Sequence, residues 1–165
     1  MLLSSYPSDY QVPKQVLPHS QSYALPEIDT APAAGVTIDT RKINNVSQVT
    51  VAAALTTNST INNLVDGGTV KFTTVNQTGN LNVNIFEAYA SNANVLNLEV
   101  SAGAARNVGI VTAAGAETIN INSDDTAANP TGLNIHLLTL TAADATSVVV
   151  TGDSAINITA IGSTK

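Results

Sequence analysis

The acidic side chains are the residues of this sequence best suited to chemistry, and that chemistry would be the binding of a cation. Asp124 and Asp125 are the only adjacent pair of acids. Neighbours in a strand point to opposite faces, but in a loop both carboxylates could reach one ion. We predict a Ca²⁺ contact through Asp124 or Asp125, with Asp144 and Asp153 as further candidates. Loop carbonyls and Asn or Thr oxygens would have to complete the roughly six to eight ligands. The alternative is that all four are solvated turn acids.

The two histidines, His19 and His136, are too few and too far apart for catalysis or zinc binding. A serine or threonine nucleophile needs a base within reach, and zinc needs three or four ligands. His136 lies in a strand-like segment, 134–137, where we expect it on the outward face. With no cysteine in the chain, disulfides and thiolate chemistry are excluded. The sequence therefore predicts no catalytic residue and no enzyme.

Charge and hydropathy exclude several classes of partner. The net charge is −6, and Arg41-Lys42 is the only adjacent basic pair. Nucleic-acid binding needs a basic patch, so we expect none. No apolar run of about 18 residues exists that could span a membrane, and the first residues lack the pattern of a secretory signal. Export, if it occurs, would use another route, or the chain is part of a larger protein.

The elements that must position these residues are short strands. Aliphatic residues alternate with Thr or Asn in segments 118–122, 138–141, 148–151 and 156–159, which is the period of a strand with one buried face. From Ile119 to Leu138 to Ile156 the phrase recurs at intervals of roughly 18–20 residues, which indicates a coil of about two strands. The fold class predicted is all-β, a parallel β-helix-like or β-solenoid-like stack of short strands. The spacing upstream is less regular, so a β-sandwich is the alternative.

Composition divides the chain near residue 34. Five of the six prolines and three of the four tyrosines precede that point. Dense proline disfavours helices and central strands and favours extended backbone. We therefore predict an extended arm or linker over 1–34 and a β-rich domain over 35–165. The arm is either a disordered leader or an assembly arm that orders against a neighbouring subunit, with these apolar and tyrosine anchors: Tyr6, Tyr10, Val12, Val16, Leu17, Tyr23 and Leu25.

The run TAAGAETININ followed by LLTLTAADATSVVVTGDSAINITA, within 112–160, resembles the repeat region of Gram-negative surface-layer proteins and RTX-type secreted adhesins. INNLVDGGTVKFTT at 61–74 and NVLNLEVSAG at 94–103 are similar to stretches that precede such repeats. The resemblance implies a β-helix-like or β-roll-like domain, one-step secretion, calcium-dependent ordering and assembly into a surface lattice. The family's calcium nonapeptide, Gly-Gly-x-Gly-x-Asp, is absent, because Gly67-Gly68 is followed by Thr-Val-Lys. Its calcium sites therefore cannot be transferred to this chain.

We predict a structural extracellular protein that self-assembles at the cell surface, through strand stacking and the arm, into a surface layer or filament. Its main partner would be another copy of itself. Two alternatives stay open. One is an adhesin-like module that binds a cell-surface glycan, although sugar sites usually include an aromatic ring and this chain has few. The other is a virion structural component.

Overall fold

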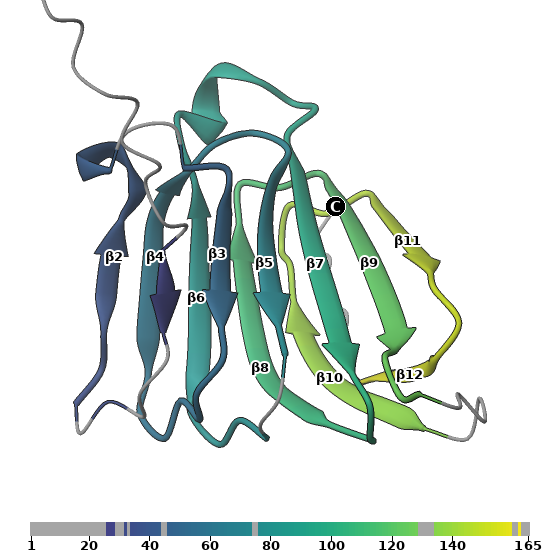
Figure 1. Ribbon diagram of the computed structural model, residues 1–165. Helices are drawn as coiled ribbons and strands as arrows, with labels where there is room; N and C mark the ends of the chain where they lie inside the picture. The colour runs from purple at the N-terminus through teal and green to yellow at the C-terminus, as the bar shows by residue number, and fades with distance from the viewer. Residues whose placement is uncertain are drawn as a thin grey trace, which may run out of the picture.

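Two facing parallel sheets form the structure, and successive turns of the chain add one strand to each (Figure 1). The computed structural model describes residues 26–28, 32, 34–43, 46–73, 76–128, 134–159 and 162. Within these residues the odd-numbered strands form sheet A, in the order β1-β3-β5-β7-β9-β11. The even-numbered strands form sheet B, in the order β2-β4-β6-β8-β10-β12.

Each strand is short, as the alternation in the sequence predicts. The strands of sheet A are β1 (Glu27–Ile28), β3 (Gln48–Val51), β5 (Gly68–Phe72), β7 (Val95–Ala102), β9 (Thr118–Asp125) and β11 (Ser147–Thr151). Those of sheet B are β2 (Thr37–Asp39), β4 (Ser59–Leu64), β6 (Asn80–Ile85), β8 (Asn107–Ala114), β10 (Ile135–Thr141) and β12 (Ala155–Thr159). Two 3₁₀ turns, η1 (Thr40–Lys42) and η2 (Ala88–Ala90), follow β2 and β6.

All ten strand pairings among the described residues are parallel, which confirms the predicted β-solenoid-like stack. A β-sandwich pairs its strands antiparallel, so that alternative does not describe this chain. Parallel neighbours need a crossover connection. Here the strand of the opposite sheet, with its two flanking turns, supplies it.

The core lies between the sheets and is built from columns of stacked aliphatic side chains. Register places Val49, Val70, Leu98 and Ile121 one above the next in sheet A, and each is at most 1% exposed. Burying such a side chain contributes about 1.5–3 kcal/mol. The alternate residues of the same strands are mostly polar, chiefly Thr, Asn, Lys and Glu, and they lie on the outer face. The period-2 pattern of the sequence therefore translates directly into one dry and one wet face per sheet.

The coil length is the part of the repeat prediction that is wrong. Hydrogen-bonded partners on successive coils lie 20 residues apart at Thr139 and Thr159, but 29 apart at Asn122 and Thr151. Ile119 stacks on Val148 within sheet A, not on Leu138, which belongs to sheet B. The interval from Ile119 to Leu138 thus joins strands of opposite sheets. Because turns of different length separate the strands, sequence intervals do not report the pairing.

Part of the predicted arm belongs to the stack. Glu27 and Ile28 form β1, which pairs with Thr50 and Val51 of β3, and Ile28 is buried. The predicted anchors Tyr6, Tyr10, Val12, Val16, Leu17, Tyr23 and Leu25 lie outside the described residues.

Candidate functional site

A shallow groove lined mainly by polar side chains lies on the outer face of sheet A. We call it the amide groove. Its volume is about 370 Å³, within the range of roughly 300–1,000 Å³ typical of small-ligand sites. It crosses β5, β7, β9 and β11, and its lining residues are Thr69, Asn97, Leu98, Glu99, Asn120, Asn122, Val149 and Thr151.

Hydrogen bonds between strands hold the side chains of the amide groove. The Asn120 side-chain amide donates to Asn97 Oδ1 at 2.9 Å, and the Asn97 amide donates to the Gly67 carbonyl at 2.7 Å. One row further along the strands, Thr151 Oγ1 donates to Asn122 Oδ1 at 3.2 Å. The parallel register puts Asn97 beside Asn120 and Glu99 beside Asn122. The groove is therefore lined by side-chain amides whose orientations are fixed by hydrogen bonds between neighbouring strands.

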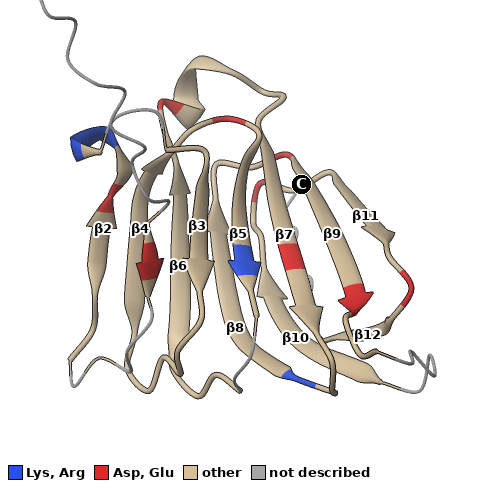
Figure 2. Ribbon diagram, viewed as in Figure 1, with Lys and Arg blue, Asp and Glu red and all other residues tan. Residues whose placement is uncertain are grey.

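One ion pair closes the side of the amide groove towards β5. Lys71 Nζ lies 2.5 Å from Glu99 Oε1, between side chains that are 29% and 26% exposed. The two residues face each other in register on β5 and β7 (Figure 2). A partly exposed pair of this kind contributes little to stability. Its main effect is that Lys71 neutralises the one charged side chain that lines the groove.

Asp125 and Asp153, two of the predicted calcium ligands, meet at a corner where the chain leaves β9. The Asp125 backbone N–H donates to Asp153 Oδ1 at 2.8 Å. The Asp125 carboxylate accepts from the Ala127 N–H and from the Asn134 side-chain amide, both at 2.9 Å. Ser154 Oγ then donates to the Asn134 carbonyl at 2.8 Å. We call this set of residues the aspartate corner. It ties the end of β9 to the start of β10 and to the turn before β12.

The other two predicted ligands lie elsewhere. The Asp124 side chain is on the outer face, where Oδ2 accepts from the Asn122 amide at 2.5 Å. Asp144 Oδ2 accepts from the Gly115 N–H at 3.1 Å in a different turn. In the described part of the chain no three His, Cys, Asp or Glu side chains gather as a metal site would require. Both oxygens of Asp125 already accept hydrogen bonds, so its observed role is to satisfy turn donors. The calcium contact stays a prediction.

The expectation that His136 faces outwards is wrong. His136 is 0% exposed and points into the core, because its register partner on β12 is the inward-facing Ile156. The Arg106 backbone N–H donates to Nδ1 at 3.1 Å. Burial lowers the pKa of His136, while the Asp124 backbone and the Asp125 carboxylate act in the opposite direction. His136 is thus a neutral core histidine beside the aspartate corner.

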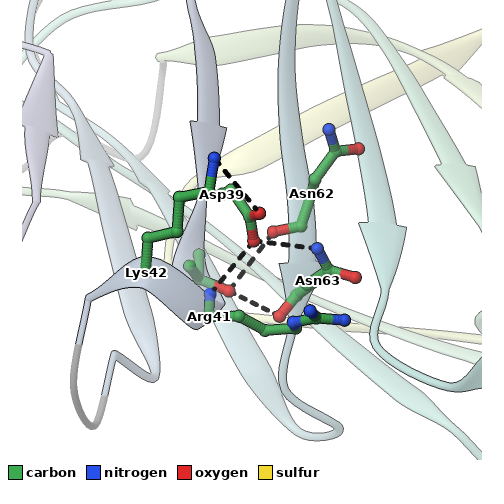
Figure 3. Close-up of polar contacts among 6 residues, drawn as sticks. Asp39, Arg41, Lys42, Asn62 and Asn63 are labelled. Carbon is green, nitrogen blue, oxygen red and sulfur yellow. Dashed lines mark hydrogen bonds and ion pairs between the residues drawn. The ribbon is translucent and has the colours of Figure 1, made fainter.

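The opposite end of the stack carries a compact polar cluster, shown in Figure 3. Asp39 Oδ1 accepts from the Asn63 amide at 2.8 Å and from the Arg41 N–H at 3.2 Å. The hydrogen bond from Asn63 is the main cause that lowers the pKa of Asp39. Thr40 Oγ1 donates to the Asn62 carbonyl at 3.3 Å. These bonds fasten η1 across the ends of β2 and β4, and we call this region the N-terminal cap.

The last coil of the described residues carries no comparable polar cluster. Val150 stacks on Ile121, which is 0% exposed, yet Val150 itself is 49% exposed. Val148, Ile156 and Ile158 also face inwards and are partly exposed. Among the described residues no strand pairs with the outer edge of β11 or β12. We call these four side chains and two strand edges the open end.

The sequence offered a partial signal for these features. The outward-facing positions of β7 and β9 include Asn97, Asn120 and Asn122. The alternation of apolar and polar residues in the sequence is enough to predict that these side chains face outwards. Their convergence into one groove depends on the pairing between coils of unequal length. That pairing was not readable from the sequence.

No protein-family model, curated protein or solved structure matches this chain. No described helix is long and apolar enough to cross a membrane.

Proposed function

We propose that this chain is a structural, secreted protein of the cell surface, which assembles with further copies of itself through its strand edges into a layer or filament. The open end is the observation that carries the proposal. An uncovered solenoid end needs a cap or a neighbour, because its edge presents unpaired backbone donors and acceptors and an apolar interior.

The chemistry of the open end suits a second copy of the chain. β11 and β12 contain no Lys, Arg, Asp or Glu, as Figure 2 illustrates. Natural proteins place charges, bulges or prolines on exposed edges when they must avoid pairing, and neither strand contains a proline. An incoming edge of the same spacing would satisfy the backbone groups and cover Val150 and Ile158.

The two ends of the stack differ, which favours ordered growth. The N-terminal cap covers the ends of β2 and β4 with Asp39, Asn63 and η1, whereas the open end has no comparable polar cluster among the described residues. The outer edges of β1 and β2 likewise pair with no described strand. If the predicted assembly arm orders against a neighbouring subunit, residues 1–25 would add a second contact between copies. Calcium, if it binds, would act on assembly or order rather than on catalysis.

Assembly is tested on the full chain by light scattering and electron microscopy across a range of concentrations. We expect the mass of the wild-type particle to rise with concentration. Val150→Lys should stay monomeric, because it places a charge at the centre of the open end. Val65→Lys is the matched control, since Val65 is 41% exposed in the turn between β4 and β5.

A wild-type chain that is monomeric at every concentration would refute the proposal. So would a Val150→Lys variant that assembles as the wild type does. Removal of residues 1–25 leaves β1 in place and tests the arm separately. Unchanged assembly of that truncated chain would show the arm to be a passive leader.

A further inference from the structure

We infer that the amide groove is a binding site for a neutral carbohydrate. This role goes beyond self-assembly and uses the outer face of sheet A rather than the open end. The inference depends on three properties of the groove: its charge, its unused hydrogen-bonding capacity and the fixed orientation of its side chains.

The charge of the groove selects an uncharged ligand. Glu99 is the one ionisable residue of its lining, and Lys71 neutralises it at 2.5 Å. The remaining polar lining residues are asparagines and threonines. An anion would find no free cation in the lining, and a metal ion would find one carboxylate that is already paired. The matching ligand is therefore neutral and rich in hydrogen-bonding groups.

The groove offers donors and acceptors together. Asn120 Oδ1 and Glu99 Oε2 accept no hydrogen bond from the described residues, and each amide that donates once keeps a second N–H. A sugar hydroxyl both donates and accepts, so it complements an amide in either sense. Neighbouring strands are about 4.8 Å apart, which lets vicinal hydroxyls of one ring contact two strands. A peptide strand would be a weaker match, because a strand lying flat on this face directs its backbone N–H and C=O groups sideways rather than towards the groove.

The side chains are already oriented before the ligand arrives. The bond from Asn120 to Asn97 and the bond from Thr151 to Asn122 restrict these rotamers. Ordering costs on binding are therefore reduced. Val149, 45% exposed at the end of the groove, provides an apolar surface for the C–H face of a ring. No aromatic ring lines the groove, so we expect dissociation constants in the millimolar range rather than the micromolar range.

The test is a titration of the ¹⁵N-labelled full chain with cellotetraose, maltotetraose and mannotetraose, followed by NMR. We expect saturable shifts of the side-chain amide signals of Asn97, Asn120 and Asn122 with at least one of the three. Asn120→Ala should weaken that binding at least tenfold. Thr69→Arg, which fills the groove with a long side chain, is a second variant whose effect does not depend on one hydrogen bond. Asn82→Ala, on the outer face of sheet B, is the matched control and should bind as the wild type does.

Two results would overturn the inference. The first is the absence of saturable shifts with all three tetrasaccharides. The second is equal binding by the wild type, Asn120→Ala and Thr69→Arg. Shifts of the groove signals that follow protein concentration without sugar would assign the groove to contacts between chains and would equally overturn it. Because Val150→Lys leaves the groove lining intact, sugar binding by that variant separates this inference from the proposed assembly.

Discussion

Replacing Asp125 with alanine should destabilise the fold to the same extent with and without calcium. Its carboxylate accepts from the Ala127 N–H and the Asn134 amide, both at 2.9 Å, and the residue is 7% exposed. A hydrogen bond to a buried charged group contributes about 1.5–3 kcal/mol. Ala127 and Asn134 are themselves partly exposed, so water replaces part of each bond. We therefore expect a loss of about 1 kcal/mol per bond, or about 2 kcal/mol in the free energy of unfolding.

Urea unfolding followed by circular dichroism measures this loss. With a denaturant slope of about 1–3 kcal/mol per molar urea, the midpoint should fall by about 1 M. Asp124→Ala is the matched control, because it removes the same charge from the adjacent residue on the outer face. The Asp124 carboxylate accepts a hydrogen bond from the Asn122 amide, and its loss should change stability by less than about 0.5 kcal/mol.

Calcium separates the two roles that Asp125 could have. If the carboxylate serves the turn donors, the difference between wild type and Asp125→Ala is the same in calcium and in excess chelator. If it ligates calcium, the difference appears in calcium alone. A variant that equals the wild type in chelator would therefore refute the structural role and restore the calcium prediction made from the sequence.

Two further perturbations test the packing around this corner. The free energy of unfolding should fall as the pH drops below the ordinary histidine value of 6.5, because burial lowers the pKa of His136 and the unfolded chain binds the proton first. This contribution to stability is complete above 6.5 and is lost between 6.5 and the lowered pKa. His136→Gln should flatten this dependence in urea titrations at several pH values, and an unchanged pH profile would contradict the assignment. Gly152→Ala should cost at least about 2 kcal/mol, since its φ is +108° and a Cβ would lie 2.1 Å from the Ser123 carbonyl oxygen. Gly67→Ala is the comparison, because its φ is +74° with nothing within 4 Å of a Cβ; there we expect the backbone cost of about 1 kcal/mol alone, and equal losses at both sites would refute the steric reasoning.

The sequence predicted the fold class because strand alternation is a local property. In segment 95–100 each aliphatic residue at 96, 98 and 100 is buried and each residue between them lies on the outer face. The resemblance to surface-layer and RTX repeats pointed to the same class of fold. Neither source gave the pairing, because the connections between strands vary and the partner of Ile119 lies beyond a whole strand of the other sheet.

His136 shows why the polarity of a residue is a poor guide where both phases of a strand are apolar. β10 contains Ile135 and Leu137 in one phase and Leu138 and Leu140 in the other. Leu138 and Leu140 are buried, whereas Ile135 and Leu137 are 52% and 45% exposed. A register shift opposite Gly109 changes the β8 pairing between Leu137 and Leu138. Stacking on the neighbouring coils therefore determines which alternate residues of β10 point into the core. His136 belongs to the same set as Leu138 and Leu140, so it is buried with them.

The amide groove and the open end are related through the axis of the stack. The row formed by Thr69, Asn97, Asn120 and Val149 crosses four successive strands of sheet A and ends at β11, the strand whose outer edge belongs to the open end. A second copy paired with that edge would place its own outer face beside this row. Each groove would then have a neighbour on the same surface. An assembled layer would bind a long glycan at several weak sites at once. The overall affinity of the layer for that glycan would then exceed the millimolar affinity of one groove. The scarcity of charge on these strands is what both the neutral groove and the pairing edge require.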